Sequence, residues 1–173
     1  MAWTTPSTWV AGAILTAAQL NQQLRDNMDA IGAPAAVQIS TTTAQTGIVV
    51  DTWTQLAFAS ATTVQNTGGF TISSGGITVP TGYGGVYLAT VSVQWDSDNT
   101  GVRVLGFSTT AALSTSLFSS SMATAANMRQ MVSGIVVLAA GASVCGAVLS
   151  TTAGRGVTSA FQTQRFSLAR LTP

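Results

Sequence analysis

This chain has few side chains that could take part in chemistry, and they belong to few residue types. The charged residues are six Arg and five Asp, and the 173 residues include no Lys, Glu or His. His is the commonest general base and a frequent metal ligand, and Glu shares with Asp the work of paired catalytic carboxylates. This inventory argues against an enzyme, including a polysaccharide depolymerase, and indicates no resident cofactor.

One pair of carboxylates has the spacing of a metal loop. The segment 96–101 reads Asp-Ser-Asp-Asn-Thr-Gly, with the Asp-x-Asp spacing and the sixth-position Gly of a calcium loop. Its twelfth position is Phe107, where an EF-hand places a bidentate Glu. A turn capped by Asx side chains is the favoured interpretation. A weak calcium site at Asp96 and Asp98 is the alternative.

Cys145 is the single cysteine, so no intrachain disulfide can form. It lies in the apolar run 144–148, and we interpret it as a small buried hydrophobe rather than a nucleophile.

The arginines are scattered, and the net charge is +1. Without a basic stripe, no nucleic-acid partner is indicated. Arg25 lies on the polar side of a predicted helix, and Arg155 at a Gly-Arg-Gly turn that, with Ser/Thr-rich turns, is a candidate contact for host glycan. The other four are expected in strands, where some would pair with Asp96 or Asp51 across an interface between copies: Arg103, Arg129, Arg165 and Arg170.

The overall composition favours strands. Charged residues make up 6% of the chain, against about 25% in typical soluble proteins. Ser and Thr, 45 residues together, supply the polar surface, and with Val and Ile they favour β structure.

One helix is predicted over 17–31. Thr16 and Gln19 have the spacing of a capping box, and Gly32 and Pro34 supply the stop signal. A stripe spaced 3, 4, 3, 4 runs along it and is widened by Met28. Two interpretations of this stripe stay open. It packs on the β domain or on another protein, or the helices of several copies associate with Asn27 on their shared axis. The stripe consists of Ala17, Leu20, Leu24, Asn27 and Ile31.

The remainder predicts a two-sheet sandwich, because short strands alternate with Gly, Asn and Pro turns and no βαβ pattern appears. Residues 1–32 are an arm and helix, 33–45 a linker by composition, and 46–173 the β domain. Strands are expected at 47–51, 53–59, 69–73, 76–79, 84–95, 102–109, 116–122, 129–138, 143–151 and 162–171.

Residues 131–150 carry no charge and are long enough for a membrane span. Gly134, Gly141 and Gly146 interrupt them, so we predict a hairpin and no membrane insertion. The N-terminus has no positive region followed by an apolar block, so we expect no secretory signal.

Three stretches of the β region carry a resemblance. Residues 84–95 resemble the Gly-x-Tyr strand of jelly rolls related to tumour necrosis factor and the complement globular head. Residues 133–144 resemble that superfamily's apolar strand, Leu and Gly turn, with Ala142 where Asp is usual, and 161–171 its final strand. The resemblance implies a homotrimer with sheets packed around a threefold axis. The candidate trimer core is Tyr87, Val91, Val93, Trp95, Val137 and Phe166.

The opening segment is similar to that of many tailed-bacteriophage structural proteins. The similar residues are Thr8-Trp9-Val10-Ala11-Gly12, Leu15 to Asn21 and Leu24 to Asn27. The resemblance implies a virion component assembled in the host cytoplasm, whose first segment binds the major capsid protein or a tail component. The candidate attachment residues are Trp3, Trp9, Leu15, Leu20, Leu24, Arg25, Asn27, Met28 and Ile31.

These expectations converge on a non-enzymatic, trimeric virion protein that decorates or projects from the capsid as a decoration or head-fibre protein. The alternative is a small tail fibre or minor tail protein whose β domain binds a host receptor or glycan.

Overall fold

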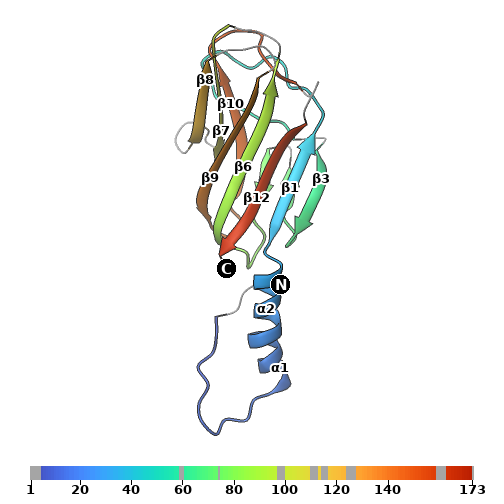
Figure 1. Cartoon of the computed structure of the whole chain (residues 1–173), viewed down its shortest axis with the longest axis vertical. Coiled ribbons are helices and arrows are strands. Elements are labelled where there is room, and N and C mark those ends of the chain that lie inside the picture. The colour runs from blue at the N-terminus through green and yellow to red at the C-terminus, as the bar shows by residue number, and fades with distance from the viewer. Residues whose placement is uncertain are drawn as a thin grey trace.

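The computed structural model describes residues 5–58, 61–73, 75–96, 100–109, 113, 117–123, 128–158 and 163–172. A helical segment extends from one end of an elongated β-sandwich, and the N-terminal arm runs beside the helix (Figure 1). The prediction of a mainly β jelly-roll sandwich preceded by one short helix is confirmed.

The helix begins at the predicted capping box. The backbone N–H of Gln19 donates to Oγ1 of Thr16 at 3.2 Å, and the Thr16 N–H donates to Oε1 of Gln19 at 2.9 Å. The helix runs through α1 (Ala17–Leu20), a π-helical turn (Asn21–Arg25) and α2 (Asp26–Gly32). The π turn has i→i+5 bonding, so residues after it are rotated from the positions that a regular 3.6-residue period would give.

The arm is hydrogen-bonded to this helix through one side chain. Oε1 of Gln23 accepts from the Ser7 N–H at 2.8 Å, and Nε2 of Gln23 donates to the Thr5 carbonyl at 3.5 Å. The arm and the helix therefore form one structural unit.

Two antiparallel sheets form the sandwich (Figure 1). The front sheet has the order β9 (Arg129–Leu138), β6 (Gly85–Trp95), β12 (Gln164–Thr172), β1 (Ala36–Thr41) and β3 (Thr62–Thr67), and β11 (Val157–Thr158) also pairs with β6. The back sheet has the order β4 (Thr71–Ser73), β5 (Gly76–Thr78), β10 (Ser143–Ser150), β7 (Val102–Ser108) and β8 (Leu117–Ala123), and β2 (Thr54–Gln55) pairs with β10.

The core lies between the sheets and follows from period-2 alternation. On β6 the odd-numbered residues 87–95 face inward and are at most 1% exposed. Phe166 of β12 packs against Phe58 with ring centroids 5.9 Å apart. Gly146 of β10 is required by this packing, because a Cβ there would lie 2.9 Å from Leu56 and 3.2 Å from Val91.

The linker interpretation of 33–45 is wrong for its central part. Ala36–Thr41 is β1, which pairs with β12 on one side and β3 on the other. Val37 and Ile39 alternate with Gln38 and Ser40, and the two apolar side chains are at most 1% exposed. The alternation was not recognised because the Ala, Ser and Thr residues around it made the segment resemble a linker in composition.

Other strand predictions need correction too. Among the described residues of the predicted strand 53–59, Thr54–Gln55 form regular strand, and 47–51 forms an isolated bridge at Val50. β3 and β11 were not predicted. The strands predicted at 84–95, 102–109, 129–138 and 143–151 lie within one residue of β6, β7, β9 and β10.

The predicted hairpin at 131–150 is also wrong. Both strands are present, but β9 belongs to the front sheet and β10 to the back sheet. The turn crosses between sheets, since Leu138 and Val144 both point into the core from opposite layers. In the described part of the chain, no helix has both the length and the apolar character needed to cross a membrane.

Candidate functional site

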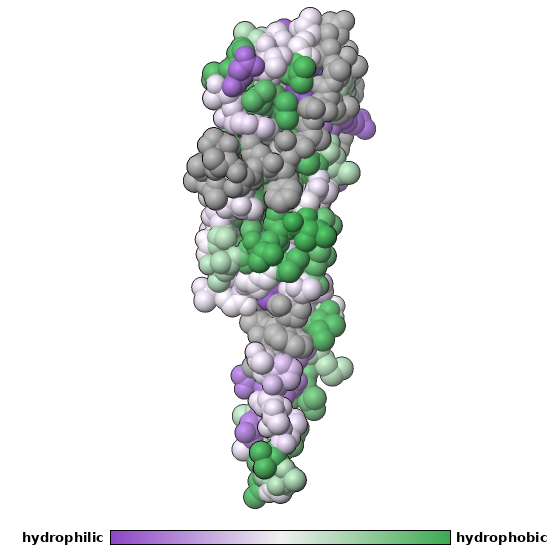
Figure 2. Space-filling view, turned by 90° about the vertical axis from the view of Figure 1, so that its left-hand side faces the viewer, coloured by the Kyte–Doolittle hydropathy of each residue, from purple (hydrophilic) through white to green (hydrophobic). Residues whose placement is uncertain are grey.

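The outer face of the front sheet carries large apolar side chains that contact solvent in the single chain. Val137 is 80% exposed, Ile135 62% and Leu88 37%. Strand register places Ile135, Leu88, Ala169 and Ala36 in one line across four strands, with Val137 opposite Val86 one step away. We call the line Ile135–Leu88–Ala169–Ala36, with Val137 and Val86, the apolar row. Figure 2 shows a hydrophobic area in the lower half of the β domain on the side where β9 lies.

The next line across the same strands is polar. It consists of Ser133, Thr90, Ser167 and Gln38, which the register aligns directly. The hydroxyls of Thr90 and Ser133 lie 2.9 Å apart and share a hydrogen bond. The outer face thus changes from apolar near the helix to hydroxyl-rich farther away.

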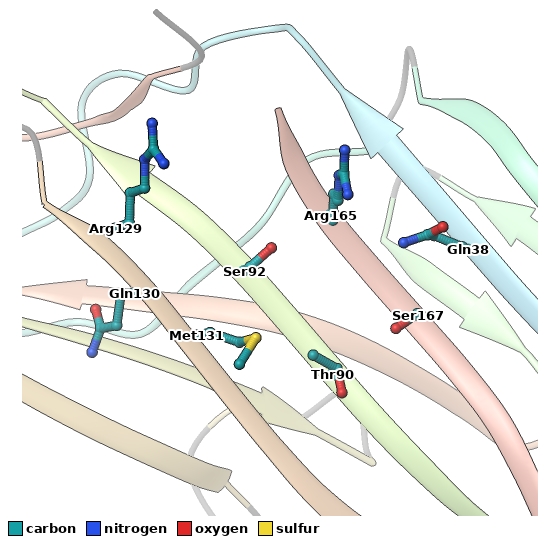
Figure 3. Close-up of a pocket in the computed structure, with 8 residues that line it drawn as sticks. All are labelled: Gln38, Thr90, Ser92, Arg129, Gln130, Met131, Arg165 and Ser167. Carbon is teal, nitrogen blue, oxygen red and sulfur yellow. The ribbon is translucent and has the colours of Figure 1, made fainter. Parts of the chain in front are cut away.

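A hollow of about 300 Å³ opens on this face, over the polar line and the residues next to it. Arg129 on β9 and Arg165 on β12 flank it, with Ser92 of β6 between them (Figure 3). Its other lining residues are Gln38, Thr90, Gln130, Met131 and Ser167.

These two arginines have no carboxylate partner in the part of the chain that the structure describes. The ion pairs there are Arg25–Asp26 at 2.9 Å and Arg103–Asp96 at 3.2 Å. Arg165 donates from Nε to the Thr163 hydroxyl at 3.2 Å, and both Arg129 and Arg165 are exposed. Within the described part of the chain, no carboxylate compensates the positive charge of the hollow.

The predicted trimer core is mostly wrong. Five of its six residues are at most 1% exposed within one chain, so they cannot meet another copy; they are Tyr87, Val91, Val93, Trp95 and Phe166. Only Val137 lies on the outer face. The sequence contained the correct signal in the alternation of β6, whose even positions Leu88, Thr90 and Ser92 point outward.

Arg103 forms an ion pair within the chain, which corrects the expectation of pairing between copies. Its side chain is fully buried, and its NH1 donates to the Asp96 carbonyl at 3.1 Å. Its guanidinium lies 5.6 Å from the Trp95 ring centre, and Nε1 of Trp95 donates to Oε1 of Gln130 at 2.8 Å. This buried polar cluster was missed because no motif links residues on β6, β7 and β9.

The candidate calcium pair is only half described, since Asp98 lies outside the described residues. The Asp96 carboxylate faces the Arg103 guanidinium and accepts the Gly156 N–H at 3.0 Å. These partners already neutralise Asp96. Among the described residues, no three His, Cys, Asp or Glu side chains cluster as metal ligands.

The helix exposes its apolar stripe, which excludes packing of that stripe on the chain's own β domain. Leu24, Met28 and Ile31 are 57%, 70% and 65% exposed, and Leu20 is 39% exposed. Asn27 is 5% exposed, so it does not belong to this exposed stripe. Of the other candidate attachment residues, Trp9 and Leu15 are exposed, Arg25 pairs with Asp26, and Trp3 lies outside the described residues.

The structure also places the two remaining candidates, Cys145 and Arg155. Cys145 is 5% exposed, and burial raises the pKa of its thiol above the ordinary value of 9.0. Arg155 is half-buried, and its carbonyl accepts the Ile48 N–H at 3.1 Å, so it is not an exposed loop tip.

Comparison with known proteins identifies the fold. No family model matches the chain, and no curated protein matches it. Among solved structures, the vertex protein P5 of phage PRD1 aligns with a TM-score of 0.59 at 16% identity, over 79% of this chain and 73% of that one. Murine APRIL aligns with a TM-score of 0.59 at 14% identity, over 79% and 98%.

The chain has the same jelly-roll fold as these structures. The Eiger TNF of S. frugiperda also aligns, with a TM-score of 0.51 at 17% identity over 80% of this chain and 92% of that one. At these identities the likeness establishes the fold. Function must be argued from the surfaces described above.

Proposed function

We propose that this chain is a non-enzymatic virion structural protein that forms a homotrimer through the outer face of its front sheet. In this proposal residues 1–32 attach the trimer to the particle and the jelly roll projects from it. The observation that carries the proposal is the apolar row, where Val137 and Ile135 are 80% and 62% exposed.

The apolar row needs a partner on physical grounds. Contiguous exposed apolar surface is typical of interaction sites, and it is unfavourable on a protein with only 6% charged residues to keep it soluble. A second and third copy present the same row, so closed symmetry would cover all three. Each fully buried Val, Leu or Ile contributes about 1.5–3 kcal/mol.

The helix supports the attachment role. Besides the exposed stripe of the helix, the arm presents apolar side chains to solvent, with Trp9 44% and Val10 72% exposed. The stripe points away from the β domain's own core, so it is available to a groove on the particle. A virion role also agrees with the shared fold of the vertex protein P5. For the predicted contact with host glycan, none of the described residues marks a binding pocket.

Attachment is tested by assembling particles with a Leu24→Asp, Met28→Asp double variant. We expect the variant to fold and to form trimers but to be lost from purified particles, because two charges would be buried in the contact. Val49→Asp is the matched control, since Val49 is 58% exposed on the β domain. Retention of the double variant at wild-type copy number would contradict attachment through this helix.

A further inference from the structure

The hollow on the front sheet combines three properties of an oxyanion site. It has two arginines without a carboxylate partner among the described residues, hydroxyl groups along its lining, and a volume of about 300 Å³. A hollow of this volume accommodates a small ion together with part of its hydration shell.

The register brings the two guanidinium groups to opposite sides of one strand. Arg129 pairs with Gln94 and Arg165 with Ser92, so the two lie on either side of β6 and two residues apart along it. Strand spacing and rise then put their Cα atoms about 12 Å apart. In Figure 3 the two side chains extend in the same direction, one on each side of Ser92. Two long side chains can close on an ion from that separation.

The chemistry of the lining selects an oxyanion. Guanidinium groups form paired, charge-assisted hydrogen bonds to phosphate or sulfate oxygens, and Ser and Thr hydroxyls donate further bonds. Ser92, Thr90 and Ser167 supply such hydroxyls along the lining. None of the described residues that line the hollow carries a carboxylate. A cation is thereby disfavoured.

We propose that this hollow binds a free inorganic oxyanion, phosphate or sulfate, and that the ion stabilises the trimer. This inference rests on the proposed trimer, in which the outer face of the front sheet turns toward the threefold axis. Three copies then bring six arginines close together, and their repulsion opposes assembly unless anions lie between them. A face turned to the axis admits a free ion but not a phosphate carried on a polymer.

The test is equilibrium dialysis of the full chain against radiolabelled sulfate, with phosphate as competitor. We expect saturable binding of at most one ion per chain, displaced by phosphate. An Arg129→Gln, Arg165→Gln double variant should bind at least tenfold more weakly. Arg25→Gln removes an exposed cation far from the hollow and should bind as wild type does. No saturable binding, or equal binding by the double variant, would overturn the inference.

The same samples separate this inference from the trimer itself. Sedimentation in sulfate and in chloride at equal ionic strength removes general screening as an explanation. We expect sulfate to lower the trimer's dissociation constant at least tenfold in wild type and not in the double variant. If the chain forms a trimer but binds no sulfate, the oxyanion site is refuted and the trimer stands. If the chain stays a monomer but binds sulfate, the site stands, and both the trimer and the ion's role in stabilising it are refuted.

Discussion

At the scale of single residues, the buried Arg103 holds the end of the sandwich farthest from the helix. It neutralises Asp96 and stacks over Trp95, which is itself bonded to Gln130. Arg103→Ala leaves Asp96 without its cation and opens a cavity, so we expect the free energy of unfolding to fall by about 3 kcal/mol. Chemical denaturation measures this loss.

Arg25→Ala is the matched control for that substitution. Arg25 pairs with Asp26, but its side chain is 57% exposed. Exposed pairs contribute about 0–1 kcal/mol. Equal losses for the two variants would show that the Arg103 cluster has no special role.

Cys145 gives the stability a definite dependence on pH. Burial raises the pKa of its thiol above 9.0, so above that pH the unfolded chain releases this proton more readily than the folded chain. The free energy of unfolding should therefore fall as pH rises beyond about 9. Burial also raises the pKa of Tyr87, which acts in the same direction from about pH 10.

Denaturant unfolding between pH 8 and pH 10 in wild type and Cys145→Ala checks this expectation. The loss between pH 8 and 10 should be smaller in the variant. Identical pH profiles would contradict a buried thiol.

At the scale of elements, β1 is where the structure differs most from the sequence prediction, because this strand was predicted to be a linker. Ile39 is fully buried in a strand hydrogen-bonded on both edges. Ile39→Ala should cost about 3 kcal/mol of unfolding free energy. Ser40→Ala, on the outward side of the same strand, should cost under about 0.5 kcal/mol. A cost of Ile39→Ala no larger than that of Ser40→Ala would restore the linker interpretation.

The sequence predicted those elements whose signals are local. The capping box at Thr16 placed the start of the helix, and the long alternation of 84–95 placed β6. The two-residue strands β2 and β11 are too short to produce a pattern, and they exist because a neighbouring strand offers an edge. The assignment of β9 and β10 to different sheets is equally nonlocal, because a turn alone does not say which layer the next strand joins.

The surfaces were predictable only in part. The exposed helix stripe was identified from its spacing, but Asn27, which the same spacing places on the stripe, is buried. Five trimer-core candidates were wrong because large apolar side chains on a strand of this sandwich fill the core first. The hollow was missed because Arg129 and Arg165 lie 36 positions apart and meet only through the pairing of β9, β6 and β12.

At the scale of the whole molecule, a single chain leaves two apolar surfaces exposed: the outer face of the front sheet and the stripe of the helix. The apolar row is the part that another copy would cover. Ile135→Asp would bury a charge in that contact, so we expect it to raise the trimer's dissociation constant at least about 100-fold, equivalent to about 3 kcal/mol. Val49→Asp, outside the row, should leave assembly unchanged, and dissociation by both variants would point to a nonspecific effect.

The molar mass of the full chain in solution tests the proposal most directly. Sedimentation equilibrium at micromolar concentration should give three times the chain mass of 17.6 kDa for wild type, and a shift toward the single-chain mass for Ile135→Asp. A wild-type chain that sediments as a monomer across that range would contradict the trimer.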